Sequence, residues 1–398
     1  MTASAARATQ PADRAIPAFL FAYLVIGTGV VLLMGIMNEL AAGLAVSVAQ
    51  AGQLASVSAV VMAVGAPLLA SITSRIDRRR LLVASLLLYA LGHLACAVAP
   101  GYLSLMVIRT VAMLAPAVFT PQAAATIGLM VPPERRASAV TAIFLGWSIA
   151  SVAGMPIGSL IGAHIGWRAS FAFVGMLAAI ATVWVARVTP AGLRVPPVSL
   201  AAWGRALGDR RLMLVLAVTL ASAGAQFVLM VYLTPSLAML TRGGPNLIAA
   251  LLVLFGIAGV IGNTWISRRI DRLGTDRAVT ACLALMLTAM LAWGAASLSA
   301  ALLWPTLLMA CIGWGLGCFS SNSAQQARLV ATAPALASVS IALNTSGMYA
   351  GQAIGATVGG ATLTAVGLGA LPWVAAAGLV GAIALSLAAA RQPARAVA

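Results

Sequence analysis

The sequence reads SRIDRRR at residues 74–80 and RRIDRLGTDR at residues 268–277. The tetrapeptide at 75–78, Arg-Ile-Asp-Arg, therefore recurs at 269–272, about half of the 398-residue chain later. Each copy directly follows the second long apolar stretch of its half. This correspondence predicts a chain built from two similar halves, repeated in the same direction.

Apolar residues dominate the composition. Hydrophobic residues make up 62% of the chain and charged residues only 8%, a balance that a soluble protein could not keep away from water. A helix needs roughly 20 apolar residues to cross a bilayer. Twelve such stretches are present, so we expect an all-α membrane protein with twelve transmembrane helices in two six-helix bundles. The stretches cover 17–37, 50–72, 81–99, 103–127, 138–162, 168–188, 212–236, 246–266, 278–298, 302–322, 337–362 and 368–390.

The positive charge has a clear pattern along the chain. The net charge is +16, and all 23 cationic side chains are arginines. With the N-terminus in the cytoplasm, only Arg168 and Arg242 fall in outer loops and only Arg109 lies inside a predicted helix. This asymmetry follows the positive-inside rule. It predicts a multi-pass protein of the bacterial inner membrane with both termini cytoplasmic. A nucleic-acid site would need a contiguous basic stripe, so membrane lipid is the expected partner and nucleic acid is not.

The loops and helices suggest five segments. We expect a cytoplasmic N-terminal tail over 1–16, a first bundle over 17–188, a cytoplasmic linker rich in Pro and Arg over 189–211, a second bundle over 212–390 and a cytoplasmic tail over 391–398. The first apolar stretch lacks a cleavage site and is expected to stay in the membrane. The four cysteines lie in predicted helices without metal-site spacing, so we expect no metal and no cofactor.

Glycine recurs every fourth residue in the fifth helix of each half. The first set is Gly154, Gly158 and Gly162, and the second runs from Gly347 through Gly351 and Gly355 to Gly359. Small residues at this spacing clear one face of a helix, so that a neighbouring backbone can approach closely.

Several motifs together resemble the major facilitator superfamily. The segments GAPLLASITSRIDRRRLL (65–82) and GVIGNTWISRRIDRLGTDR (259–277) are similar to its loop between the second and third helices of a half. The first copy departs from the pattern, with Ser74 in place of the usual Asp and Asp77 in place of the usual Gly. Arg109 and PERR (133–136) resemble the family's fourth helix and the loop that follows it.

The predicted fifth helix of the first half resembles one group within this family. GWSIASVAGMPIGSLIG (146–162), with Gly154, Pro156 and Gly158, is similar to the signature of exporting members, and MNELAAGLAVS (37–47) is similar to drug and sugar-efflux proton antiporters of the arabinose efflux type. The resemblance implies a monomeric transporter that exports a drug-like or sugar-like small molecule in exchange for protons, by rocker-switch alternating access. A proton-coupled or passive importer on the same fold is the alternative. Nothing resembles a catalytic constellation, so we do not expect an enzyme.

Proton coupling requires a group that gains and loses a proton as access alternates. Six of the seven acidic residues belong to predicted cytoplasmic segments, which leaves Glu39 near the outer end of the first helix. An arginine within the membrane is costly unless it is paired or hydrated, so Arg109 is the second candidate and could contact Glu39. His93 and His164 are alternative proton carriers, because imidazole titrates near neutral pH.

The repeated loops supply candidate gating residues. Asp77 and Arg78 in the first half, and Asp271 and Arg272 in the second, could form ion pairs that hold one conformation and release it during switching. Topological anchoring is the simpler alternative. For substrate binding, the resemblance directs attention to polar and aromatic residues of the helices that line the family's cavity. The candidates are Tyr23, Gln122, Gln226, Tyr232, Trp314 and Asn344.

Overall fold

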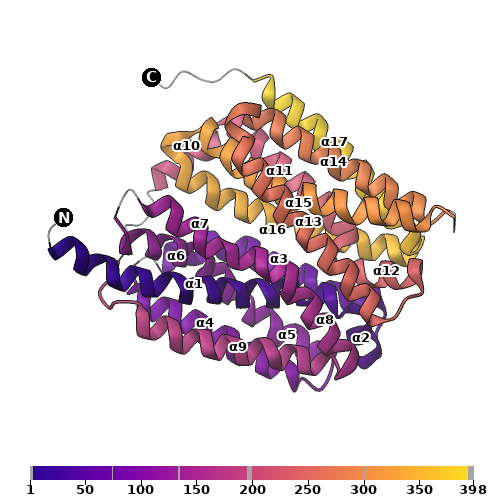
Figure 1. Cartoon of the computed structure of the whole chain (residues 1–398), viewed down its shortest axis with the longest axis horizontal. Helices are drawn as coiled ribbons and strands as arrows, with labels where there is room; N and C mark the ends of the chain where they lie inside the picture. The colour runs from indigo at the N-terminus through magenta and orange to yellow at the C-terminus, as the bar shows by residue number, and fades with distance from the viewer. Residues whose placement is uncertain (1–2, 74, 133–134, 195–199, 299–300, 393–398) are drawn as a thin grey trace. The chain divides into compact units, whose positions relative to one another are not determined.

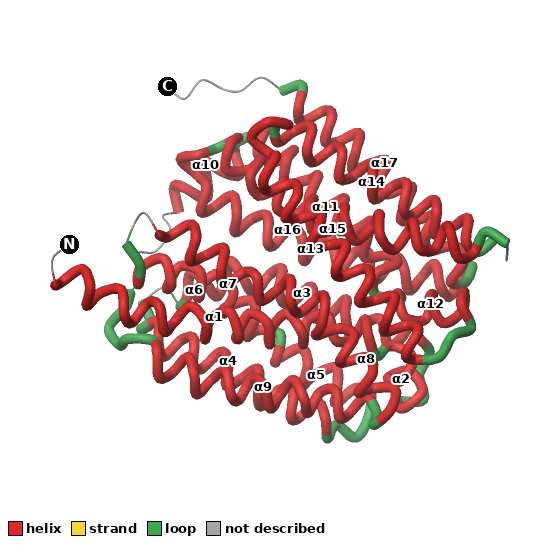
Figure 2. The backbone as a smooth tube through the Cα atoms, in the orientation of Figure 1, coloured by secondary structure: helices red, strands yellow, loops and turns green. Residues whose placement is uncertain are grey.

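The computed structural model describes residues 3–73, 75–132, 135–194, 200–298 and 301–392, and within these ranges the regular elements are all helices (Figures 1 and 2). A helix satisfies its own backbone hydrogen bonds, which lipid cannot do. Eleven helical segments of the described chain are long and apolar enough to cross a membrane. The remaining expected span forms α16 (Ala337–Ala365), whose 29 residues suffice in length but include several glycines and the polar Asn344 and Gln352. The predicted all-helical membrane fold is confirmed.

The chain divides into two compact units. Unit 1 comprises Met1–Ala45 and Val64–Pro197, and unit 2 comprises Val46–Ala63 and Val198–Ala398. The helix α3 (Val48–Ile72) therefore contributes its first part to unit 2 and its second part to unit 1. The sequence had suggested a simpler division, with all of 17–188 in the first bundle.

Unit 1 is organised around its first helix. Helix α1 contacts α7, α8 and α9, and α4 lies along α9. Besides part of α3, the unit contains α1 (Ala3–Gly35), α2 (Met37–Gly43), α4 (Arg78–Ala97), α5 (Tyr102–Ala112), α6 (Leu114–Met130), α7 (Arg136–Ile149), the π-helical turn η2 (Ala150–Gly154), α8 (Met155–His164) and α9 (Trp167–Val188).

Unit 2 repeats this plan. Helix α11 contacts α16 and α17 extensively, and α15 lies against α13 and α14. The unit contains α10 (Leu200–Gly208), α11 (Arg210–Met230), α12 (Leu233–Thr241), α13 (Pro245–Leu273), α14 (Thr275–Ala296), α15 (Leu303–Thr332), the 3-10 turns η3 (Pro334–Leu336) and η4 (Leu368–Ala370), α16 and α17 (Leu371–Ala390).

Several boundaries differ from the expectation. Helix α1 begins at Ala3 and so takes in most of the predicted tail, where alanines favour helix. The predicted linker contains a short helix, α10. Helix α15 continues to Thr332, ten residues beyond its predicted end. Ser74 and Glu134, which belong to the motifs of the first half, lie outside the described residues.

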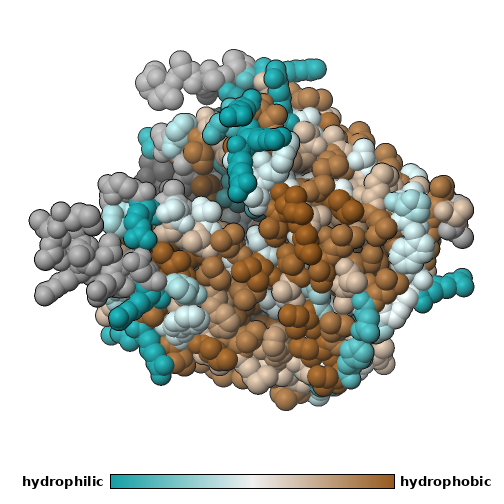
Figure 3. Space-filling view, in the orientation of Figure 1, coloured by the Kyte–Doolittle hydropathy of each residue, from teal (hydrophilic) through white to brown (hydrophobic). Residues whose placement is uncertain are grey.

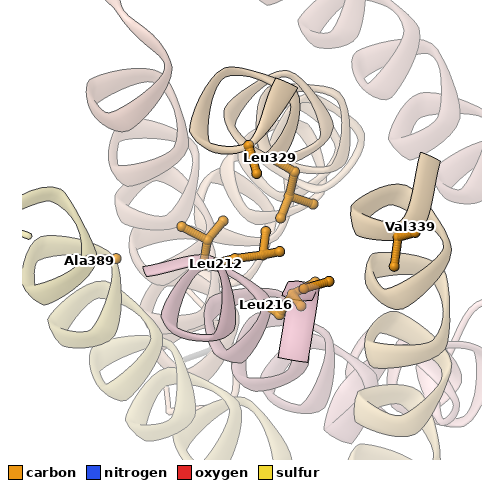
Figure 4. Close-up of a cluster of buried hydrophobic side chains, with 8 residues drawn as sticks. Leu212, Leu216, Leu329, Val339 and Ala389 are labelled. Atoms are coloured by element: carbon orange, nitrogen blue, oxygen red, sulfur yellow. The ribbon is translucent and has the colours of Figure 1, made fainter. Parts of the chain in front are cut away.

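The surface and the core agree with a lipid environment. Large hydrophobic side chains such as Leu68, Val107 and Ile180 are more than half exposed, and hydrophobic residues cover much of the visible face in Figure 3. Lipid tails can cover such surface, whereas water would not. Inside unit 2, Leu212 and Leu329 belong to a buried cluster that joins α11, α15, α16 and α17 (Figure 4).

Candidate functional site

The glycines of the fifth helix in unit 1 face α1. A Cβ atom on Gly154 would overlap the hydroxyl of Thr28, and one on Gly158 would lie 2.6 Å from Leu32 Cδ1. Pro156, which is buried, stands at the start of α8 directly after the π turn η2. Proline provides no N–H for a helical hydrogen bond, and a π turn is one way in which a helix absorbs that loss.

A buried arginine of α5 contacts α1 at Gly29, directly after the Thr28 that faces Gly154. Arg109 of α5 is 1% exposed, donates from Nη2 to the carbonyl oxygen of Gly29 at 3.1 Å, and lies over the ring of Phe171 at 5.7 Å. His93 of α4 is fully buried and also lies against Gly29 and Phe171. Sequence reasoning had allowed a contact between Arg109 and Glu39, but the acceptor of Arg109 is a main-chain carbonyl of α1.

Glu39 lies in α2, beyond the end of α1 and ten residues after Gly29. Ten residues of helix correspond to about 15 Å, so Arg109 and Glu39 are not brought together, and no ion pair joins them within the described part of the chain. Glu39 is half-buried, and its Oε2 has no hydrogen-bond partner among the described residues. Burial raises the pKa of the Glu39 carboxyl above its ordinary value.

Asp77 and Arg78 contact the beginning of the linker. Asp77 caps α4 by accepting from Arg80 N at 3.1 Å, and it also accepts from Gly192 N at 2.5 Å. Slight burial raises the pKa of Asp77, but these main-chain N–H groups outweigh it and lower the pKa below its usual value. The backbone of Arg78 donates to the carbonyl of Leu193 at 3.0 Å. The inner loop of unit 1 thereby holds the beginning of the linker.

Two substrate candidates of unit 1 take part in buried hydrogen bonds. The guanidinium of Arg78 is 1% exposed and donates from Nη1 to Gln122 Oε1 at 2.8 Å. The hydroxyl of Tyr23 donates to the carbonyl of Thr120. Gln122 and Tyr23 therefore link α6 to α4 and α1, respectively.

The corresponding loop in unit 2 is different. Asp271 and Arg272 are exposed near the end of α13, and no ion pair of the described residues includes them. An ion pair occurs nearby between Asp276 and Arg328 at 2.6 Å. Arg328 also donates to the hydroxyl and carbonyl of Ser386, at 3.1 and 3.0 Å. Sequence reasoning missed this pair because Arg328 was expected in a loop, whereas α15 carries it into the buried interior of unit 2.

A small polar recess with a volume of about 30 Å³ lies within unit 2, between α11, α14, α15 and α16. None of the residues that line it is charged. The lining consists of Val218, Thr219, Ser222, Ala223, Gln226, Val279, Leu283, Cys318, Ser321, Asn322, Gln325 and Met348.

Hydrogen bonds fix the polar side of this recess. Gln325 Nε2 donates to Thr219 Oγ1 at 3.0 Å, and Thr219 donates to Asn344 Oδ1 at 2.6 Å. Cys318 Sγ donates to Gln226 Oε1 at 2.9 Å. Gln226 thus lines the recess and Asn344 supports it from behind. Thr219 and Gln325 escaped the sequence analysis. Thr219 lies on a helix that the resemblance places around the cavity, whereas Gln325 lies beyond the predicted end of its helix at residue 322.

Two aromatic candidates lie away from the recess. Tyr232 is fully buried at the end of α11, and its hydroxyl donates to the carbonyl of Ala356 at 3.1 Å. Trp314 is fully buried between Phe255 and Trp293, with ring centroids 5.3 and 5.9 Å away. Both side chains pack helices of unit 2 together.

Membrane-spanning helices in two repeated halves, with an uncharged polar recess in one of them, define a membrane transporter. The model of the Major Facilitator Superfamily matches residues 19–356, and the chain belongs to this family. It is 34% identical to a chloramphenicol resistance protein of Streptomyces lividans over 65% of this chain and 67% of that protein. It is 25% identical to a probable sugar efflux transporter of Mannheimia succiniciproducens, covering 92% of this chain and 90% of that protein.

The fold also matches a solved structure. A bacterial homologue of the human lysosomal transporter Spinster, in an inward-facing and unoccupied conformation, superposes with a TM-score of 0.69. The match covers 96% of this chain and 95% of the other at 15% sequence identity. At that identity the likeness concerns the fold alone.

Proposed function

We propose that this transporter exports a small, neutral, drug-like or sugar-like molecule from the bacterial cytoplasm by proton antiport. It works in the inner membrane as a monomer with cytoplasmic termini, by rocker-switch alternating access. The observation that carries the proposal is the recess of unit 2. Its lining combines amide and hydroxyl groups with apolar side chains and has no charge, a chemistry suited to a neutral ligand that bears hydroxyl or amide groups once the recess widens during the transport cycle.

Two further observations support export in particular. The glycine and proline pattern of the fifth helix resembles that of exporting members of the family, and one relative is named as an efflux transporter and another as a resistance protein. For coupling, Glu39 and Arg109 are the candidates from the sequence. For gating, Asp77 with Arg78 and Asp271 with Arg272 are the candidates, one pair at each inner loop.

Chloramphenicol and arabinose are suitable probes. The protein is reconstituted in vesicles with a pH-sensitive dye inside, and each probe is added under an imposed gradient of the probe. Proton movement opposite to the probe, with uptake that saturates, supports antiport. Probe movement together with protons, or without them, would replace the proposal by a proton-coupled or passive importer.

The recess is tested by a matched pair of variants. Gln226→Ala removes an amide that lines the recess, whereas Gln352→Ala removes a buried amide of α16 that is not part of the lining. We expect the first variant to raise the KM for the transported probe about tenfold, equivalent to about 1.4 kcal/mol of lost binding, and the second to leave it near the wild-type value. Equal effects of the two variants would remove the recess from the proposal.

A further inference from the structure

His93 is a buried histidine whose ring is oriented by one hydrogen bond to the main chain. It is 0% exposed on α4, and its Nδ1 lies 2.9 Å from the carbonyl oxygen of Tyr89. A carbonyl oxygen only accepts, so Nδ1 must carry the hydrogen. The other ring nitrogen, Nε2, lies against the main chain of Gly29, which attracts a proton there, but no hydrogen bond of good geometry to Nε2 forms among the described residues. In this conformation the ring is a neutral imidazole with an unused lone pair on Nε2.

Arg109 supplies a permanent positive charge at the same place. Its Nη2 donates to the carbonyl of Gly29, the residue that His93 Nε2 faces, and both side chains lie near the ring of Phe171. Arginine stays protonated in proteins. Its Nε and Nη1 have no hydrogen-bond partner, and no carboxylate of the described chain forms an ion pair with it. The charge is therefore not neutralised locally.

No carboxylate is found among the described side chains that contact His93. From α1 the contact is the main chain of Gly29, and from α9 it is the apolar Phe171. On α4 itself the titratable neighbours are Tyr89, whose ring is 4.2 Å away, and Cys96, one turn further along. The hydroxyl of Tyr89 is already engaged with the carbonyl of Ile26 at 2.9 Å. Arg109 of α5 is the charged neighbour.

A proton on Nε2 would place a second cation beside Arg109 in a buried, poorly screened space. Like charges at such a site repel strongly because little solvent lies between them. The present packing therefore disfavours protonated His93, and protonation favours any conformation in which His93 and Arg109 separate. A ligand that binds one conformation better than another shifts the population toward it, and here that ligand is the proton.

We propose that His93 is the proton-binding group of the transport cycle and that Arg109 makes its protonation incompatible with this conformation. The inference rests on the proposed proton antiport and specifies its coupling site. It assigns the proton to α4, whereas sequence reasoning favoured Glu39. Gly29 makes the arrangement sterically feasible, because a Cβ atom at this position would overlap the hydroxyl of Tyr89 and approach His93 Nε2 to 2.7 Å.

The test compares the two histidines of the chain. His93→Asn keeps an N–H donor near the Tyr89 carbonyl but cannot take up a proton. His164→Asn makes the same change at an exposed position at the end of α8. Each variant is reconstituted, and two rates are measured with labelled chloramphenicol or, if only arabinose is transported, with labelled arabinose. The first is exchange without a pH gradient, from about pH 5 to pH 8, the range in which histidine changes charge. The second is accumulation driven by a pH gradient.

We expect His93→Asn to exchange the probe at a rate that no longer depends on pH, and to lose accumulation driven by a pH gradient. His164→Asn should behave as wild type in both measurements. Gradient-driven accumulation that survives in His93→Asn would overturn the inference, and its loss in Glu39→Gln alone would return the role to Glu39. If wild type exchanges the probe without responding to the gradient, the antiport proposal itself fails.

A second variant keeps the test decisive if His93→Asn does not reach the membrane. Arg109→Gln removes the charge that opposes protonation of His93, so protonation no longer selects a conformation. Exchange should persist at low pH while accumulation is lost. Undiminished accumulation in Arg109→Gln would also overturn the inference.

Discussion

Each unit contains a glycine-rich contact between two helices, but the atoms that lie nearest to these glycines differ between the units. In both units the fifth helix of the half lies against the first. In unit 2, a Cβ atom on Gly351, Gly355 or Gly359 of α16 would overlap a main-chain carbonyl oxygen of α11. In unit 1, a Cβ atom on Gly154 or Gly158 would meet side chains of α1, and one on Gly162 would meet the side chain of Ile36, directly after α1.

This difference has a mechanical consequence. A side chain can rotate away from an intruding methyl group, whereas a main-chain carbonyl can move only with its helix. The contact in unit 1 also contains the π turn η2 and Pro156, so its hydrogen-bond ladder is already irregular. We infer that the α11–α16 contact is a fixed element of unit 2, and that the contact of α1 with α8 at Gly158 tolerates rearrangement, whereas Gly146 of α7 lies directly against the main chain of α1 at Leu20.

The largest effect is expected at Gly355. In Gly355→Ala the new methyl group would overlap the carbonyl of Gly224 and lie 3.0 Å from Phe227 Cβ. The two helices must then separate, at a cost of about 3 kcal/mol, at the upper end for overpacked cores. Thermal unfolding of the purified protein in detergent measures the loss.

Gly381→Ala is the matched control for this variant. Gly381 lies in α17 with open space around its Cβ position, and alanine is a better helix former than glycine by about 1 kcal/mol. The control should therefore be neutral or slightly stabilised. A Gly355→Ala protein that is as stable as Gly381→Ala would show that the α11–α16 contact is not rigid.

The inner loops offer a second comparison between the halves. Asp77 caps α4 and accepts a hydrogen bond from the linker, whereas Asp271 is exposed and has no ion pair among the described residues. Removing a capping carboxylate typically costs about 1 kcal/mol. We expect Asp77→Ala to lose about that amount in thermal unfolding and to expose the linker near Gly192 to protease.

Asp271→Ala should change neither the stability nor the cleavage of the linker. Equal losses in the two variants would mean that the aspartates serve the same purpose despite their different contacts. If Asp271→Ala instead abolishes transport while Asp77→Ala does not, the gating role predicted for the repeated loop belongs to the second half.

Much of this organisation could be predicted from the residues. The apolar stretches predicted the positions of the helices, because a membrane span has a minimum length. The regularly spaced glycines predicted which helices approach a neighbour closely. The contacts of Asp77 and Arg328 could not be predicted. They depend on the position of the linker backbone and on the extra turns of α15, which tertiary packing sets. His93 illustrates the same limit, since only the fold brings it to Arg109.

The recess of unit 2 shows a further limit of prediction from the sequence. Gln226 could be found from its helix and its polarity, but Tyr232 and Trp314 were selected by the same criteria and belong to the packing of the unit. Burial decides between these roles. An amide at an open recess remains available to a ligand, whereas a hydroxyl or indole sealed between helices does not.

The smallest effect is expected at Gly158, and it is the sharpest test of the comparison. In Gly158→Ala the new methyl group meets the terminal Cδ1 of Leu32 at 2.6 Å and no other atom within 4 Å. A rotation of Leu32 removes the conflict at a cost of about 1 kcal/mol, which the higher helix propensity of alanine offsets by a similar amount. The net change in unfolding free energy should be close to zero, and we expect transport to slow because α1 and α8 then fit together in fewer arrangements. A loss as large as that of Gly355→Ala, measured by the same thermal unfolding, would mean that Leu32 cannot move and that both contacts are rigid. The difference between the units would then lie in the π turn at Pro156 alone.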